Sequence, residues 1–174
     1  MHASNTQKTL IRAVISGNYP DFTKLCAESS VSISEYITPT ESWNLLHSCF
    51  ISPHLCANID IVNHATQLGV ATNASDIYGN TPLYYAIRQG SLEGVQCLLE
   101  SGANPNHQNS DGLSPLRYCF LQKPYHYEIV KQLLDSGANL ENRIGQEGKN
   151  DYAFIKTVAF DHPDILTLIR TTKP

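Results

Sequence analysis

Gly79-Asn-Thr-Pro-Leu-Tyr-Tyr-Ala86 is the stretch that indicates the fold, together with Gly102-Ala-Asn-Pro-Asn106 at its far end. Thr81 suits the N-cap of a helix, where its hydroxyl can accept from free amides of the first turn, and Pro82 suits the first helical position. Gly90 can take a positive φ and end that helix. The two helices that follow from this pattern are antiparallel, of roughly two to three turns, and each is too short to be stable alone. The apolar face of the second helix consists of Leu92, Val95, Leu98 and Leu99.

The same unit returns further along the chain. Gly112-Leu-Ser-Pro-Leu116 lies 33 residues after Gly79-Asn-Thr-Pro-Leu83, and Gly137-Ala-Asn139 lies 35 residues after Gly102-Ala-Asn104. A period of 33 residues that carries Thr-Pro-Leu and Gly-Ala-Asn resembles the ankyrin repeat. The resemblance covers nearly the whole chain and implies an all-α solenoid of helix–turn–helix repeats with β-turn fingers along one edge. It also implies a module that binds other proteins, without indicating which protein is bound.

We expect a single domain over residues 1–174 with about five repeats, of which the first and last are atypical because their outer faces meet water. In the second repeat, Asn44 is the expected N-cap, and His47 occupies the family's histidine position, where the imidazole bonds to backbone of the neighbouring finger. The loop between the two helices is longer in the second and fourth repeats, at residues 51–58 and 122–127. The expected repeats are 7–34, 40–74, 76–108, 109–142 and 145–172.

The composition is that of an ordinary globular chain, with 174 residues, 41% hydrophobic and 16% charged. No run of about 18 apolar residues occurs, and the first residues lack a basic segment followed by an apolar one. We therefore expect no membrane span and no Sec-type signal. The five cysteines are odd in number and unevenly spaced, which favours reduced, mostly buried thiols and a cytoplasmic location. A monomer is expected when no partner is bound.

Acidic charge is concentrated in the middle of the chain, within an overall net charge of −4. Residues 35–108 hold six acidic residues against one base, Arg88, which leaves −5. We expect this charge to lie along the concave face of the second and third repeats, where it would repel nucleic acid and attract a basic protein surface. An ordinary solvated acidic face is the alternative interpretation.

Two His-x-Cys pairs raise the question of a metal site, His47-x-Cys49 and His54-x-Cys56. Residues two apart on a helix point about 200° apart and cannot both face one zinc ion, so we predict a scaffold histidine, a buried thiol and no metal. Cys56, on a loop, has the setting best suited to reactivity. The sequence contains no nucleophile elbow, phosphate-binding glycine loop or paired carboxylates, so we expect no catalytic residue, no cofactor and no enzymatic activity.

The candidate binding surface follows from the resemblance to the ankyrin family. In that family, finger residues beside the glycine and exposed positions late in the first helix line a concave face. Trp43 is the only tryptophan and Tyr78 lies at a finger tip, and aromatic side chains often dominate interface energetics. The alternative is that Trp43, Ile77 and Leu113 pack finger against finger; two tyrosines on or beside the inserted loop form a second candidate edge. The predicted partner-binding residues are Glu41, Trp43, Ile77, Tyr78, Asn80, Arg88, Gln89, Asp111, Leu113, Leu121, Gln122, Tyr125 and Tyr127.

The predicted function is binding of another protein, in which a basic surface of the partner contacts the acidic and aromatic concave face of this chain. A small acidic chain of this kind resembles inhibitors such as the ankyrin-type immunity proteins that neutralise bacterial toxins. A secreted effector or viral protein that imitates an inhibitor of host transcription factors is the alternative of the same class. An enzyme that depends on Cys56 is the alternative from another class.

Overall fold

The computed structural model describes residues 2–28, 32–52, 56–145 and 148–172. These residues form helices joined by turns and loops, with an isolated β-bridge between Arg143 and Asn150 and no strand in the described ranges. The elements are α1 (His2–Ile15), α2 (Tyr19–Glu28), the 3-10 helix η1 (Ile33–Glu35), α3 (Leu45–Cys49), α4 (Ile59–Gln67), α5 (Pro82–Gln89), α6 (Leu92–Glu100), α7 (Pro115–Cys119), α8 (Tyr127–Asp135), α9 (Asp151–Val158) and α10 (Pro163–Thr172).

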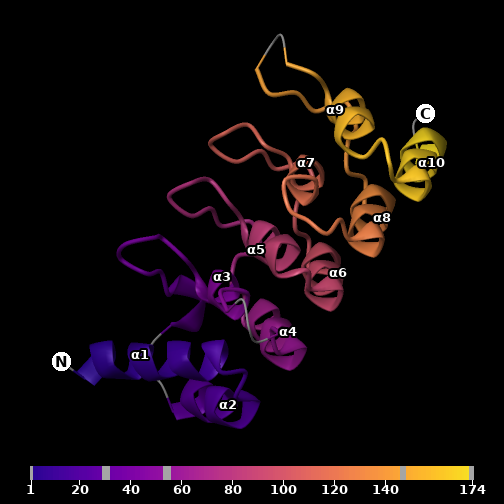
Figure 1. Cartoon of the computed structure of the whole chain (residues 1–174). Coiled ribbons are helices and arrows are strands. Elements are labelled where there is room, and N and C mark those ends of the chain that lie inside the picture. Colours follow the sequence, from indigo (N-terminus) through magenta and orange to yellow (C-terminus); the bar gives the residue numbers. More distant parts are fainter. Residues whose placement is uncertain (1, 29–31, 53–55, 146–147, 173–174) are drawn as a thin grey trace.

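The helices stack in two rows (Figure 1). In the inner row, each of α1, α3, α5, α7 and α9 contacts the next, and in the outer row the same holds for α2, α4, α6, α8 and α10. The loops before α3, α5 and α7 project from the side of the stack away from the outer row, and α1 and α10 lie at opposite ends (Figure 1). The predicted all-α solenoid with fingers along one edge is therefore confirmed.

Each finger is a narrow turn closed by a backbone hydrogen bond. Thr38 N–H donates to Trp43 O at 2.8 Å, and Asp76 N–H donates to Asn80 O at 2.9 Å. The turns need a left-handed residue, which is Gly79 (φ 75°) in one finger and Ser42 (φ 59°) at the matching position of another. A Cβ at position 79 would lie 2.7 Å from the backbone nitrogen of Ser110, so the close approach of the next finger also requires glycine there.

The inner helices are held by burial. Leu83 of α5 and Leu116 of α7 have no exposed surface, and α3 and α7 contain only five residues each. A helix of one to two turns is unstable alone, so packing between neighbours supplies its stability. The sequence predicts longer loops in the second and fourth repeats, and the inner helices of these two repeats, α3 and α7, are the short ones.

Asparagine side chains connect successive repeats at the turn after each outer helix. Asn73 Nδ2 donates to Gly102 O at 2.8 Å, while Asn104 N–H donates to Asn73 Oδ1 at 2.8 Å. The same pair of hydrogen bonds recurs 33 residues later. There Asn106 Nδ2 donates to Gly137 O at 2.8 Å, and Asn106 Oδ1 accepts from Asn139 N–H. These bonds fix the spacing between repeats because each asparagine satisfies one acceptor and one donor of the next turn.

Most of the predicted helix-cap details hold, and one is wrong. Asn44 caps α3 by accepting from His47 N–H at 3.2 Å, and His47 Nε2 lies 3.1 Å from Asn80 O in the next finger, as predicted. Thr81 is the N-cap of α5, but its side chain makes no capping hydrogen bond. Its backbone carbonyl accepts from Tyr84 N–H instead. Pro82 removes one free amide from the first turn, which reduces the need for a side-chain cap.

Candidate functional site

Two large apolar side chains project from the tip of the finger before α5. The side chains of Ile77 and Tyr78 are 55% and 61% exposed. Their backbone is fixed on both sides, because Ile77 N–H donates to Glu41 O at 3.1 Å and Ser110 N–H donates to Tyr78 O at 3.0 Å. These exposed side chains thus stand on a backbone that needs no ordering when a partner binds.

A chain of aromatic and polar groups runs from the finger toward the inner helices. The indole Nε1–H of Trp43 donates to the hydroxyl of Tyr85 at 2.8 Å, and this hydroxyl donates to Asp76 Oδ2 at 2.5 Å. The rings of Trp43 and Tyr85 meet edge to face with centroids 5.7 Å apart, and Arg88 Cζ lies 4.6 Å from the Tyr85 centroid. Burial, followed by the adjacent Asp76 carboxylate, raises the pKa of Tyr85, so the phenol stays protonated and keeps donating.

A hollow of about 310 Å³ lies beside Arg88 and is lined by Phe50, Ile51, Ser52, Arg88 and Gln89. The Gln89 side chain is bonded to the loop after α3: its Nε2 donates to Ser52 O at 2.9 Å, and its Oε1 accepts from Ala57 N–H at 3.2 Å. Gln89, predicted to contact a partner, therefore also connects α5 to the loop of the preceding repeat.

Two other predicted contact residues are engaged within the scaffold. Asn80 Oδ1 accepts from Asn109 Nδ2 at 2.9 Å, and its carbonyl faces His47. Leu113 is half-buried, and its carbonyl accepts from the Tyr84 hydroxyl at 2.5 Å. Trp43 is half-buried as well. The alternative interpretation, that Trp43, Ile77 and Leu113 pack finger against finger, therefore agrees with the half-burial of Trp43 and Leu113 and not with Ile77, which is 55% exposed.

Most of the predicted residues of the fourth repeat lie outside helices. Asp111 is exposed at a finger tip. The resemblance places Leu121 and Gln122 late in the first helix of this repeat, but α7 ends at Cys119, so both residues lie after the helix. Leu121 is 50% exposed and Gln122 is half-buried. The two tyrosines predicted on or beside the inserted loop do not form an open edge. Tyr125 is half-buried, and its hydroxyl donates to Val158 O at 3.2 Å. Tyr127 is the first residue of α8.

The expected acidic concave face is wrong. Three of the six acidic residues of the range 35–108 lie exposed on the outer row: Asp60 on α4, and Glu93 and Glu100 on α6. Asp76 is buried and accepts from finger amides and Tyr85. Glu41 lies in the finger before α3, and Glu35 is the last residue of η1. The three acids on the outer helices occupy positions turned toward water, where charge costs least.

Three of the four residues of the two His-x-Cys pairs lie in the described ranges: His47, Cys49 and Cys56. His47 bonds to Asn44 and Asn80, while Cys49 Sγ donates to Leu45 O at 3.4 Å, so the two side chains have separate partners. No group of three possible metal ligands occurs among the described residues; His54 lies outside them. Burial raises the pKa of the Cys49 thiol to about 12 and also raises that of Cys119, which leaves both unreactive. Cys56 is exposed.

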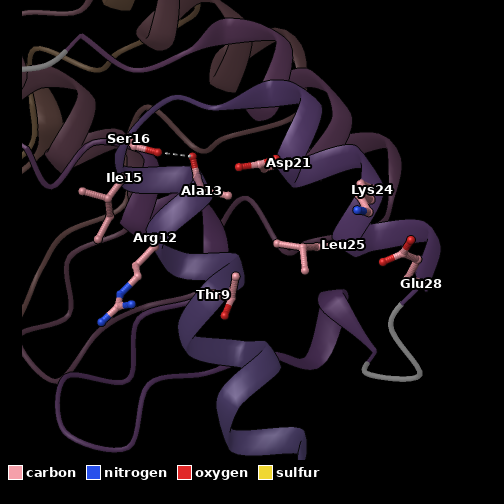
Figure 2. Close-up of a pocket in the computed structure, with 9 residues that line it drawn as sticks. All are labelled: Thr9, Arg12, Ala13, Ile15, Ser16, Asp21, Lys24, Leu25 and Glu28. Atoms are coloured by element: carbon pink, nitrogen blue, oxygen red, sulfur yellow. Dashed lines mark hydrogen bonds between the residues drawn. The ribbon is translucent and has the colours of Figure 1, made fainter.

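A second hollow, missed by the sequence analysis, lies between α1 and α2 and has a volume of about 630 Å³. Leu25 points from α2 toward α1 across it (Figure 2), and the charged residues that contribute to its lining are Arg12, Asp21, Lys24 and Glu28. Exposed charges of both signs surround a small apolar floor. The sequence carries no signal for this hollow beyond the atypical first repeat.

No helix within the described ranges has the length and apolar character required to cross a lipid bilayer.

Comparison with known proteins agrees with the repeat geometry. The family model for ankyrin repeats (3 copies) matches residues 10–109 and 53–144. Similar proteins include an ankyrin repeat protein of fowlpox virus, 32% identical over 90 residues (52% of this chain, 12% of the relative), and mouse Rabankyrin-5, 41% identical over 80 residues (45% and 7%). Human transient receptor potential cation channel subfamily A member 1 is 37% identical over 73 residues (42% and 6%). This chain spans less than a quarter of the length of each of these relatives, and it belongs to the ankyrin repeat family.

Proposed function

We propose that this chain is a non-enzymatic module that binds a protein partner on the surface formed by its fingers and inner helices. Ankyrin repeats are protein-interaction modules, and the family model matches most of the chain. The observation that supports this particular surface is the exposure of Ile77 and Tyr78 on a fixed finger backbone. Exposed apolar groups of this size on a rigid support are typical of binding surfaces.

Charge on this surface suggests how the partner is arranged. Glu41 and Asp111 lie at the tips of the fingers before α3 and α7, on either side of the finger that carries Ile77 and Tyr78, and Asp111 is exposed while Glu41 is partly so. Basic groups of the partner would therefore meet the finger tips. The acidic residues of α4 and α6 belong to the opposite row and take no part in this proposal.

An inhibitory role is the narrower form of the proposal. If the partner is a toxin or an enzyme, its neutralisation requires that the fingers cover its active surface, and this would be seen as loss of its activity at stoichiometric amounts of this chain. The matched relatives include both viral and cellular proteins, so they do not favour one role over the other. The partner distinguishes the two roles: an immunity protein binds a toxin, and a viral mimic binds a host transcription factor. The proposal also includes a monomeric chain and a reducing compartment, and the free cysteines support the compartment.

The test is to isolate the partner by affinity capture from the cells that produce this chain, and then to measure its binding kinetics with variants. Tyr78→Ala and Ile77→Ala should each shorten the lifetime of the complex, with Tyr78→Ala costing about 2 kcal/mol or more. Glu41→Lys should chiefly slow association, and more so at low salt. Lys131→Ala is the control because Lys131 lies exposed on α8 and pairs only with the exposed Asp135 in the described structure.

The proposal fails if both finger variants bind like the wild type. If Tyr125→Ala and Tyr127→Ala then abolish binding, the loop edge of the fourth repeat is the binding surface. Cys56→Ser should leave binding unchanged; a chemical activity lost in that variant alone would favour the enzyme alternative.

A further inference from the structure

Arg88 carries an exposed charge that no described residue neutralises. It is the single base within residues 35–108, and it takes part in none of the ion pairs found in the described ranges. Its guanidinium lies over the ring of Tyr85 at 4.6 Å. Since Tyr85 is held by Trp43 and Asp76, the cation stands on a fixed aromatic surface and its N–H groups are available to an acceptor.

The hollow beside Arg88 combines this charge with apolar surface. Phe50 and Ile51 contribute apolar atoms, and Gln89 is occupied by its bonds to the loop. A volume of about 310 Å³ accommodates one or two side chains and is too small for a folded element. An extended segment of the partner fits these dimensions, with a charged group at Arg88 and an apolar group beside it.

We propose that Arg88 binds an aspartate or glutamate side chain of the partner, with a neighbouring aliphatic residue in the hollow. A carboxylate matches the planar donor pattern of a guanidinium and can bond to it through two N–H groups. A phosphate carries more charge than one cation balances, and the charges at the finger tips before α3 and α7, Glu41 and Asp111, are acidic. This inference rests on the proposed function, because it concerns a segment seated on the same surface.

The arrangement also orients the partner. Trp43, Tyr85 and Arg88 are linked by the contacts described above, and Glu41 lies at the finger tip two residues before Trp43. A segment that carries a base opposite Glu41 and an acid opposite Arg88 is favoured in one direction, and the reversed segment meets like charges at both ends.

The experiment uses NMR with ¹⁵N-labelled protein and two matched probes, acetyl-Leu-Glu-Leu-amide and acetyl-Leu-Gln-Leu-amide. The Glu peptide should give saturable shifts of the Arg88 Nε–H and the Ile51 and Ser52 amides, and should bind about tenfold more tightly than the Gln peptide, as expected for one charge-assisted hydrogen-bonded pair. Arg88→Gln should abolish this difference. Lys123→Gln should preserve it, because that variant removes another exposed cation that lies over a tyrosine ring, 5.5 Å from the centroid of Tyr125.

The inference is overturned if both peptides shift the same signals equally, if Arg88 does not respond, or if the preference for Glu survives in Arg88→Gln. Tighter binding of acetyl-Leu-phosphoserine-Leu-amide would also overturn it and assign the hollow to a phosphorylated segment. These outcomes are independent of the kinetics with Tyr78→Ala. A partner that needs Tyr78 while the peptides show no preference leaves the proposed function standing and rejects the role of Arg88 alone.

Discussion

At the scale of single residues, His47 shows how burial sets a protonation state. Its Nδ1 lies 3.1 Å from the backbone nitrogen of Asn44 and 2.8 Å from Asn44 Oδ1, and its Nε2 faces Asn80 O at 3.1 Å. Burial lowers the pKa of His47 below its ordinary value, and the carbonyl of Asn80 and the charge of Asp76 oppose this shift only in part. The neutral imidazole is thus part of the contact between the second and third repeats.

We predict that the free energy of unfolding falls as the pH drops from about 7 toward 5, because the unfolded chain takes up a proton at His47 near pH 6.5 and the folded chain does so only at lower pH. Stability from this residue is complete above the unfolded pKa, and one proton contributes a slope of at most about 1.4 kcal/mol per pH unit. Urea unfolding at several pH values measures this slope. His47→Gln should flatten it; an unchanged slope in the variant would assign the pH dependence to other groups.

At the scale of elements, the short inner helices depend on their neighbours. Leu83 lies in α5 between α3 and α7, and Leu116 lies in α7 between α5 and α9. Both are fully buried. A cavity at either position is therefore shared by contacts with both adjacent repeats.

Leu83→Ala and Leu116→Ala should each lower the free energy of unfolding by about 2–5 kcal/mol, through lost burial and an unfilled cavity. Leu121→Ala is the matched control, because this leucine is 50% exposed and should change stability by about 0.5 kcal/mol or less. Urea unfolding followed by far-UV circular dichroism measures all three. Wild-type stability in both core variants would mean that these leucines do not form the core.

At the scale of the whole molecule, a buried ion pair attaches the last repeat to the stack. Arg117 Nε of α7 donates to Asp151 Oδ1 of α9 at 2.7 Å, and the two side chains are 6% and 1% exposed. Ser114 Oγ donates to Asp151 Oδ2 at 2.5 Å, and Arg117 Cζ lies 4.6 Å from the ring centroid of Phe154. In a solenoid each repeat contacts its neighbours alone, so this interface controls whether the end of the stack opens separately.

Asp151→Ala should therefore leave an uncompensated buried cation, costing about 3–5 kcal/mol at this interface. Hydrogen exchange should show lost protection in α9 and α10 with protection retained in α5 and α6. Asp135→Ala is the control, since it removes an exposed carboxylate paired with Lys131 and should have almost no effect. Uniform loss of protection along the whole chain would indicate that the stack unfolds as one cooperative unit.

Much of the fold could be predicted because its signals are local and repeat. Pro82 and Pro115 begin helices α5 and α7 at the predicted places. The bond from His47 to the next finger followed from the family position, and Cys49 is the buried thiol predicted beside it. Each such feature depends on residues within one repeat or at one fixed offset from it.

Tertiary structure alone decided which residues remain available at the surface. Glu93 and Asp76 both count as acids in the sequence, yet one is exposed on an outer helix and the other is buried beneath Tyr85. Arg88 and Arg117 are likewise both basic, and only Arg117 has a buried carboxylate partner, 34 residues away. Sequence spacing determined the repeats because helix and turn preferences act over a few residues; the exposure and pairing of charges depend on how one repeat packs against the next, since burial penalises an unpaired charge and solvent does not.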